Sequence, residues 1–444
     1  MKLPLALVLL APAALAADKA AVNAPLPLSL KRAVAIALAP EGSAKVQLST
    51  EAEKQAETRS AEARAALLPD LSAAFSEQNM TRNLAAVGIQ LQLPVLGIQF
   101  PTFVGPFSVM DARVSANQSV FDFSSIRRYQ AAKVGISASK SDLNGAEEQV
   151  ASQVARAYLA AIKADADVET ARANIGLSEA LQKQAENLKT AGTGTGIEIT
   201  RARVQLANDR QRLLVAENAQ RAARLQLLRA MNLRLDTELV LTDRLAYTPV
   251  DAVTLEGAQA QALKERPDYK AQQDRESTAR LSYSATKVER LPSVSAFGDY
   301  GASGTGFDSS LPTRTIGISV RVPIFDGGRR DARRAESASQ YRSEKVKTTD
   351  LKEQIELDVR LALDALHSAE DEVTVAKEGL DLAQNELTQA RRRNDAGVAI
   401  ALEVTDAQTR LERALDNQTA ALYNYNLARI DLAQAMGAVR RMVQ

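Results

Sequence analysis

The chain of 444 residues lacks several residue types on which common functional sites depend. It has no cysteine, no tryptophan and a single histidine, His367. Without cysteine there is no disulfide framework, no thiol nucleophile and no cysteine-ligated zinc site. A Ser-His-Asp triad would have to use His367, which lies in a long helical pattern and is interpreted as a helix-surface residue. The chain is therefore predicted not to be an enzyme, with no catalytic residue, no cofactor and no metal site.

An excess of one charge sign is also missing. Lysine and arginine number 55 and aspartate and glutamate 54, which gives a formal net charge of +1. Proteins that bind nucleic acid or acidic partners usually carry a strong excess of positive charge. No nucleic-acid partner is therefore expected.

Apolar runs long enough for a simple membrane helix are absent after the N-terminus. Residues 1–16 combine the positive Lys2 with an apolar stretch and a small-x-small ending, which is typical of a secretory signal peptide. The mature chain would then begin near Ala17, outside the cytoplasm. The uncharged segment 84–106 is interrupted by three prolines and is interpreted as an extended hairpin or loop, with a membrane helix as the lesser alternative.

Proline is absent from two long stretches, residues 123–248 and 324–444. Within them apolar residues recur at alternating steps of four and three, from Val150 to Ile175 and from Ile400 to Ala435. Sustained heptads of this kind are typical of coiled coils. The sequence therefore predicts two long helical hairpins, with helices at about 124–190 and 197–232, and at about 331–394 and 400–436. Two shorter helices are predicted to begin after the N-cap residues Ser29 and Thr254.

Four segments alternate apolar and polar residues with period two, which predicts strands with two different faces. They pair as two hairpins, 69–83 with 107–122 and 292–302 with 312–325. One interpretation is a soluble sheet on a helical layer. The other is membrane strands whose apolar side chains face lipid. Four strands cannot close a barrel, so three chains would have to share one of about twelve strands.

The sequence is internally duplicated. Ala191, Gly192 and Met231 match Ala396, Gly397 and Met436, each 205 residues later. A repeat of this length indicates a duplicated structural unit. We predict a first repeat over 17–248 and a second over 249–444, each with a short helix, a β-hairpin and a long helical hairpin.

The glycine-rich segment Gly192-Thr193-Gly194-Thr195-Gly196 invites comparison with a phosphate-binding loop. It lacks the Gly-Lys-Ser/Thr ending of such a loop, and no strand precedes it. A turn between two helices is the better interpretation, because Gly397 marks the same place in the second repeat.

Short motifs accompany these elements in order. Leu68-Pro69 and Leu291-Pro292 precede the outward strands, and Val322-Pro323-Ile324-Phe325-Asp326-Gly327-Gly328-Arg329 follows the last one. Phe121-Asp122 repeats the Phe-Asp pair, and Ala396-Gly397 leads into Leu402-Glu403-Val404-Thr405-Asp406. With these motifs the chain resembles the outer-membrane efflux protein family of TolC type, over essentially the whole mature chain.

The resemblance implies a mixed α and β membrane protein in the cell outer membrane. Three chains would share a β-barrel and a long α-helical coiled-coil barrel that forms a tunnel in the periplasm. The partners implied are the other two copies of the homotrimer, outer-membrane lipid, a periplasmic adaptor protein and an inner-membrane pump. The chain would be the passive exit duct of a tripartite efflux or type I secretion system for small molecules or proteins. Segment 84–106 would be a long extracellular loop that narrows the mouth, or a lining or plug.

The resemblance also assigns residues at the periplasmic entrance. Glu403 and Asp406, one helical turn apart, match the acidic pair of the family's last helical hairpin. Glu198 and Arg201 hold the corresponding places in the first repeat. Three copies of the acidic pair would form rings that favour cations and respond to pH. The alternative is an ordinary solvated helix face.

The tip turns themselves are the expected adaptor contact, at Ala191 and Gly192 and at Ala396 and Gly397. Family members often lock this tip with an aromatic residue and an arginine. Here Asn394 and Ala399 stand at those places, and the nearby residues 391–393, all arginine, are candidates to substitute.

Two other protein classes remain alternatives. A periplasmic coiled-coil adaptor or scaffold would need compact β domains around one helical hairpin, and the chain has two equivalent hairpins. An outer-membrane receptor or structural tube would need the same trimer as a conduit, so the sequence does not separate the two.

Overall fold

The computed structural model describes residues 26–88, 92–93, 98–99, 102–250 and 253–443. The signal peptide predicted at 1–16 and part of segment 84–106 lie outside them. The chain divides into two compact units, and each takes segments from both halves of the sequence. Unit 1 comprises Met1–Val46, Glu147–Val253 and Arg360–Gln444, and unit 2 comprises Gln47–Ala146 and Thr254–Val359. These units are not the two successive repeats predicted from the sequence. That division, at 17–248 and 249–444, stays a prediction.

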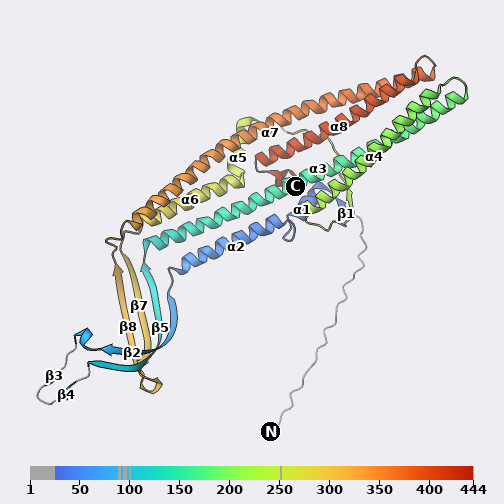
Figure 1. The fold of residues 1–444 in the computed structure, drawn as a ribbon. Helices are drawn as coiled ribbons and strands as arrows, with labels where there is room; N and C mark the ends of the chain where they lie inside the picture. Colours follow the sequence, from blue (N-terminus) through green and yellow to red (C-terminus); the bar gives the residue numbers. More distant parts are fainter. Residues whose placement is uncertain (1–25, 89–91, 94–97, 100–101, 251–252, 444) are drawn as a thin grey trace, which may run out of the picture. The chain divides into compact units, whose positions relative to one another are not determined.

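Unit 2 contains a four-stranded antiparallel sheet in the order β2-β5-β7-β8 (Figure 1). The strands are β2 (Asp70–Asn83), β5 (Phe103–Phe121), β7 (Ser293–Gly304) and β8 (Leu311–Arg321). The period-two alternation located all four. Strand β8 ends at Arg321 rather than at the predicted residue 325, because Pro323 has no N–H to donate to a ladder.

Short elements lie in the two connections of this sheet. Between β2 and β5, the 3₁₀ turn η1 (Ala85–Val87) is followed by the antiparallel pair β3 (Gln92–Leu93) and β4 (Ile98–Gln99). This pair agrees with the extended hairpin interpretation, and the described part of 84–106 contains no α-helix. The 3₁₀ turn η2 (Phe307–Ser309) lies between β7 and β8.

The sheet has one apolar and one polar face, and neither is covered. Because residues directly opposite in the antiparallel register share a face, Phe75, Val114, Tyr300 and Ile316 belong to one face. Ile316 is 85% exposed and Tyr300 67%. No residue of these four strands is buried. Within the described residues no helical layer packs on the sheet, which disagrees with the alternative of a sheet on such a layer, because that layer would bury one face.

The polar face is held by charged side chains where the two hairpins join. The Arg113 guanidinium pairs with Asp111 on its own strand β5 and reaches Asp299 Oδ1 on β7 at 3.0 Å. Two glycines allow close packing on this face. A Cβ at Gly301 would lie 2.5 Å from the Arg113 Cβ, and one at Gly317 would lie 2.5 Å from the Phe297 ring. The β5–β7 pairing thus combines the Arg113–Asp299 ion pair with the small Gly301, whereas Gly317 makes room for Phe297 in the β7–β8 pairing.

The helices of unit 2 are α2 (Ala44–Ala65), α5 (Leu255–Glu265), α6 (Pro267–Val288) and the first parts of α3 (Phe123–Thr190) and α7 (Arg329–Asp395). Their buried positions include Ala271, Ala285, Ile355 and Val359, all at most 1% exposed. Thr254 caps α5 as predicted, since its Oγ1 accepts a hydrogen bond from Gly257 N at 3.2 Å. Small buried residues let the helices approach closely.

Unit 1 contains the two long helical hairpins (Figure 1). The later parts of α3 and α7 are followed by α4 (Gly196–Ala230) and α8 (Ala401–Ala435). Strand β1 (Leu26–Leu28) pairs in parallel with β6 (Leu239–Leu241), beside α1 (Leu30–Ala37) and α9 (Val439–Val443). The Ser29 hydroxyl caps α1 as predicted.

The core of unit 1 is anchored by two buried tyrosines. Tyr158 and Tyr425 are both fully buried. Tyr158 Oη donates to Leu28 O at 2.8 Å, and Tyr425 Oη donates to Thr248 O at 2.6 Å. A buried hydroxyl without a partner would be costly, so these bonds fix the short β1–β6 region and the segment after it against the helices.

Candidate helix-tip site and strand–helix junctions

The tip turns of the two helical hairpins share one hydrogen-bond pattern. Gly192 N donates to Lys189 O at 3.0 Å, and Gly397 N donates to Asn394 O at 2.9 Å. The residue after each glycine, Thr193 or Val398, donates to the carbonyl five residues before it at 3.0 Å. The glycines have φ of 78° and 73°. Both turns are therefore Schellman motifs, in which only glycine adopts the left-handed conformation without strain.

The predicted acidic residues of the second tip lie on the first turns of α8. Glu403 is partly exposed and its Oε1 lies 3.2 Å from Arg393 Nη1. Asp406 is exposed one turn further along. The structure thus pairs Glu403 with one of the three arginines proposed to replace the missing lock. Ala396 is exposed in the turn between α7 and α8.

The first tip uses its acid differently. Glu198 Oε2 accepts a hydrogen bond from Thr195 N at 2.8 Å, which satisfies a free N–H at the start of α4. Arg201 is exposed and forms no ion pair with a described residue, and Ala191 is exposed in the turn. The structure therefore gives Glu198 a capping contact, whereas Glu403 makes an ion pair.

Asn394 connects the second tip to α3. Its Nδ2 donates to Ala399 O across the turn at 2.9 Å, and its Oδ1 accepts from Gln184 Nε2 at 3.2 Å. Asn394 and Ala399 are the two positions at which the sequence resemblance led us to expect an aromatic residue and an arginine. One amide side chain thus closes the turn and ties it to the other helical hairpin.

A buried polar cluster lies further from the tips, between α3, α4 and α8. Ser178, Asp209, Gln408 and Glu412 are each at most 3% exposed. Ser178 Oγ bonds Asp209, and Gln408 Nε2 lies 3.4 Å from both Ser178 Oγ and Glu412 Oε1. Arg212 Nη1 lies 2.7 Å from Glu412 Oε2. Sequence reasoning missed this cluster, because polar residues at Gln408 and Glu412 are spaced like a solvated helix face.

Burial controls the charge of this cluster. Removal from water raises the pKa of Glu412, and the ion pair with Arg212 offsets part of that rise. The Arg212 side chain is 56% exposed and that of Glu412 4%, so in this ion pair only the carboxylate is shielded from water. The cluster therefore contains a carboxylate that resists ionisation.

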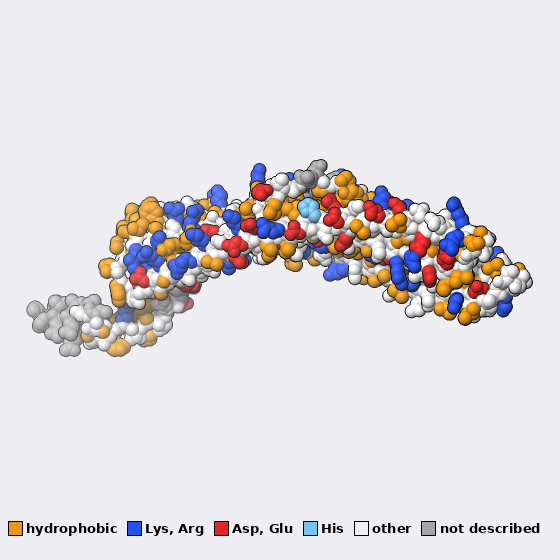
Figure 2. Space-filling view, turned by 90° about the horizontal axis from the view of Figure 1, so that it is seen from above, with side chains coloured by type: hydrophobic (Ala, Val, Ile, Leu, Met, Phe, Trp, Pro, Cys, Tyr) orange, Lys and Arg blue, Asp and Glu red, His pale blue; other side chains and the backbone are white. Residues whose placement is uncertain are grey.

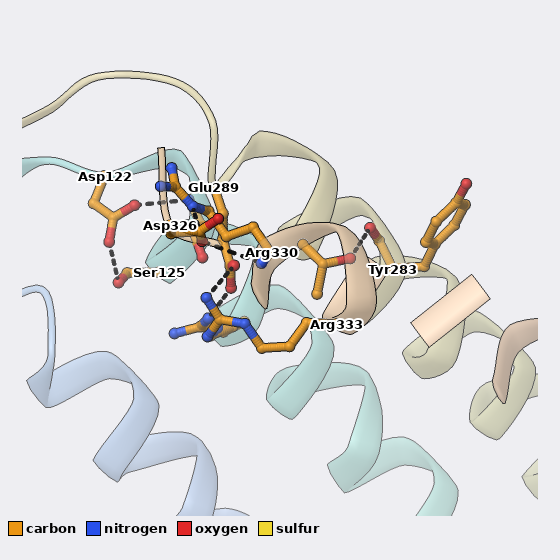
Figure 3. Close-up of polar contacts among 10 residues, drawn as sticks. Asp122, Ser125, Tyr283, Glu289, Asp326, Arg330 and Arg333 are labelled. Carbon is orange, nitrogen blue, oxygen red and sulfur yellow. Dashed lines mark hydrogen bonds and ion pairs between the residues drawn. The ribbon is translucent and has the colours of Figure 1, made fainter. Parts of the chain in front are cut away.

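The repeated Phe-Asp motif starts the two longest helices. Asp122 Oδ1 accepts from Ser124 N at 2.9 Å and its Oδ2 accepts from Ser125 Oγ at 2.6 Å (Figure 3). Asp326 Oδ2 accepts from Arg330 N at 3.1 Å and from Arg330 Nε at 2.7 Å. Hydrogen bonding to Arg330 lowers the pKa of Asp326. Each aspartate satisfies free backbone N–H groups where a strand gives way to a helix.

Glu289 at the end of α6 links these helix starts. Its carboxylate pairs with Arg128 of α3 and lies 3.0 Å from Arg333 Nη2 of α7 (Figure 3). The Glu289 side chain is only 9% exposed. A single carboxylate thus holds α3, α6 and α7 together at the strand end of unit 2.

Other features of the described chain can be stated briefly. His367 is exposed on α7, as expected, beside a cavity of about 140 Å³ that Leu363, Glu370 and Leu432 also line. Within the described residues, no cluster of three His, Cys, Asp or Glu side chains could hold a metal ion. Among the helices in that part of the chain, none combines the length and the apolar character needed to cross a membrane.

Solved structures share this architecture. The Campylobacter jejuni CmeC outer membrane channel superposes with a TM-score of 0.78 at 16% identity, covering 92% of this chain and 85% of that one. The open state of the Neisseria gonorrhoeae MtrE outer membrane channel gives 0.77 at 18% identity, covering 92% and 89%. The fold of this chain is therefore that of these outer-membrane channels.

The sequence comparisons identify the family. The family model described as outer membrane efflux protein matches residues 36–233 and 259–438, so the chain belongs to the outer membrane efflux protein family. It is 24% identical over 382 residues to the alkaline protease secretion protein AprF of Pseudomonas aeruginosa, covering 80% of this chain and 79% of the relative. It is 25% identical over 396 residues to the pyoverdine export outer membrane protein OpmQ of the same species, covering 86% and 80%. The family places the chain in the outer membrane.

Proposed function

We propose that three copies of this chain form a passive exit duct through the outer membrane. The observation that carries the proposal is the uncovered sheet of unit 2. Its outer strands β2 and β8 each pair on one side only among the described residues, and its apolar face is exposed. Bare apolar side chains are unfavourable in water, and unpaired strand edges are unfavourable in lipid. Pairing β2 of one copy with β8 of the next would remove all edges in a barrel of about twelve strands.

The helical hairpins of unit 1 would continue the duct into the periplasm. Glu403 and Asp406, with Glu198 and Arg201, would line its entrance, and the turns at Ala191-Gly192 and Ala396-Gly397 would contact a periplasmic adaptor bound to an inner-membrane pump. The names of AprF and OpmQ connect those relatives with protease secretion and pyoverdine export. On that basis the cargo is a small molecule or a protein that passes without chemistry.

The first experiment is the native mass of the mature chain extracted from outer membranes in mild detergent. A trimer supports the shared barrel. A soluble monomer would contradict it and leave the periplasmic coiled-coil scaffold as the better account.

The entrance assignment needs a separate test. In planar bilayers, the double variant Glu403→Gln/Asp406→Asn is expected to lose cation preference, because the rings lose their negative charge. The matched control is Glu378→Gln/Asp381→Asn. These two acidic residues have the same spacing and are exposed on α7. Unchanged conductance and ion preference in the tip variant would rule out the entrance role of these residues.

A further inference from the structure

The strand–helix junctions of unit 2 carry a surface to which the proposed function gives no role. Ile324 is 94% exposed, Phe325 87% and Val322 56%. Phe121 and Leu291 at the neighbouring junctions are 43% and 45% exposed. An exposed apolar band of this size on a folded protein marks an interaction surface.

The band continues the apolar face of the sheet. Val120 and Val320 are 60% and 61% exposed and are the last residues of that face before the junctions. Along β8 the exposed apolar side chains continue from Ile316, Ile318 and Val320 to Val322 and Ile324 in the junction. Whatever covers the face of the sheet must end close to this band.

Basic residues are concentrated beside the band. Segments 120–130, 286–293 and 320–336 contain nine lysines and arginines against five aspartates and glutamates, in a chain of almost no net charge. Figure 2 shows Lys and Arg side chains gathered next to hydrophobic ones at the sheet end of unit 2. The local excess of positive charge therefore accompanies the apolar band.

Part of this positive charge is already used inside the protein. Arg128 and Arg333 pair with Glu289, Arg290 pairs with Asp331, and Arg330 pairs with Asp326. Four further arginines are not neutralised in this way. All four are exposed, and none forms an ion pair with a described residue: Arg127, Arg321, Arg329 and Arg334. Arg127 donates to the neutral Gln130 and Arg334 hydrogen-bonds Tyr283, so these contacts do not cancel the charge. Arg329 contributes to lowering the pKa of Asp326. Their charge is available to an external partner.

We propose that these four arginines and the apolar band form a junction belt that binds the phosphate headgroups of anionic phospholipids. The proposal rests on the proposed barrel, in which the apolar face of the sheet lies in hydrocarbon and the junctions lie at its polar boundary. Aromatic and aliphatic side chains suit that boundary, and the guanidinium fork matches phosphate oxygens. Basic residues close to a membrane surface are attracted by its anionic lipids.

A neighbouring copy of the chain is the other occupant that an apolar band could have. The charge balance of the belt segments, nine basic residues against five acidic ones, favours an anionic partner, and the chain as a whole carries almost no net charge. Anionic headgroups would neutralise the positive excess of these segments. The lipid is therefore the occupant that fits both properties of the belt.

The experiment compares the mature wild-type trimer with Arg127→Gln/Arg329→Gln/Arg334→Gln, the belt variant, which removes three of the four belt arginines and leaves the paired arginines intact. The control is Arg221→Gln/Arg360→Gln/Lys377→Gln, which removes three exposed basic residues of unit 1. The thermal midpoint in neutral detergent is measured with added phosphatidylglycerol, phosphatidylcholine or inorganic phosphate. For the wild type and the control, phosphatidylglycerol is expected to raise the thermal midpoint more than phosphatidylcholine or inorganic phosphate does. In the belt variant the rise caused by phosphatidylglycerol is expected to be at most half as large.

Each other outcome overturns the proposal. If the two lipids had equal effects on the wild type, or if phosphatidylglycerol stabilised the belt variant as much as the wild type, the belt would not recognise anionic headgroups. If inorganic phosphate raised the thermal midpoint of the wild type as much as phosphatidylglycerol does, the belt would bind phosphate in general and not a lipid. A belt variant that no longer forms trimers, with an intact control, would make the belt a contact between copies. A wild type that is itself not trimeric would refute the shared barrel, and the belt with it.

Discussion

Glu412 is a carboxylate held out of water within a helical bundle. Burial raises its pKa above the ordinary value of 4.5. Between pH 4.5 and that raised pKa the folded chain binds more protons than the unfolded chain, so stability falls as pH rises through this window. We predict that Glu412→Gln removes this loss, because Arg212 stays partly solvated without its partner. Thermal midpoints from pH 4.5 to 8 should show the midpoint of the variant rising relative to that of the wild type as pH increases.

The control for this prediction is Glu378→Gln, at an exposed site on α7. Its midpoint should follow the wild-type curve at every pH. A Glu412→Gln variant that loses stability most at the higher pH values would mean that the ion pair with Arg212 outweighs the cost of burial.

Asn394 is predicted to restrain the second helix tip. In Asn394→Ala the bonds to Ala399 and Gln184 are lost together, so the turn is freed from α3. Single-channel recordings should show more frequent or larger openings than in the wild type. Asn385→Ala, at an exposed site on the same helix, should conduct normally. Equal recordings from both variants would show that the amide bridge does not hold the entrance.

At this scale the sequence was informative where a residue acts on its own backbone. Ser29 and Thr254 were predicted as N-caps because a hydroxyl before an apolar pattern has a local use. Asp209 and Glu412 were not recognised, because their burial depends on α3, α4 and α8 meeting in space. A charged residue spaced along a helix looks the same whether it faces water or a neighbouring helix.

At the scale of elements, the strand–helix junctions are the places where a single aspartate starts a helix of 67 or 68 residues. Asp122→Ala should lower the free energy of unfolding by about 1 kcal/mol, the usual cost of losing an N-cap. Urea unfolding monitored by circular dichroism measures this change. Asp308→Ala, at an exposed position between β7 and β8, should have almost no effect. Equal losses in both would show that the cap contributes nothing specific.

The elements themselves were largely predictable. Absence of proline over more than a hundred residues, with heptads inside, located α3, α4, α7 and α8 to within about three residues of their observed bounds. Alternation located the strands. The pairing of β5 with β7 was not predicted, because these strands are far apart in sequence and no turn connects them. Arg113 and Asp299 carry that pairing, and neither stands out in its own strand.

For the whole molecule, the absence of cysteine provides a direct test of the proposed barrel. Single cysteines can be introduced without background labelling, at Ile316 on the apolar face and Thr315 on the polar face. In intact outer membranes we predict that a charged maleimide labels Thr315→Cys at least about tenfold faster than Ile316→Cys, because lipid shields the latter. In denaturant both should react alike. Equal labelling in membranes would place both faces in water and contradict the barrel.

Helices α4 and α8 both have 35 residues, and their C-terminal ends carry matching backbone hydrogen bonds, with left-handed Asn232 and left-handed Gly437 at equivalent places. This equality constrains how the family can change. Deleting one heptad from both helices of a single hairpin would make that hairpin shorter than the other. The contact between Asn394 and Gln184, which joins the two hairpins near their tips, would then be lost. A viable insertion or deletion in one half of the gene therefore calls for a matching change in the other half, so the two halves should vary in length together as the chain diverges.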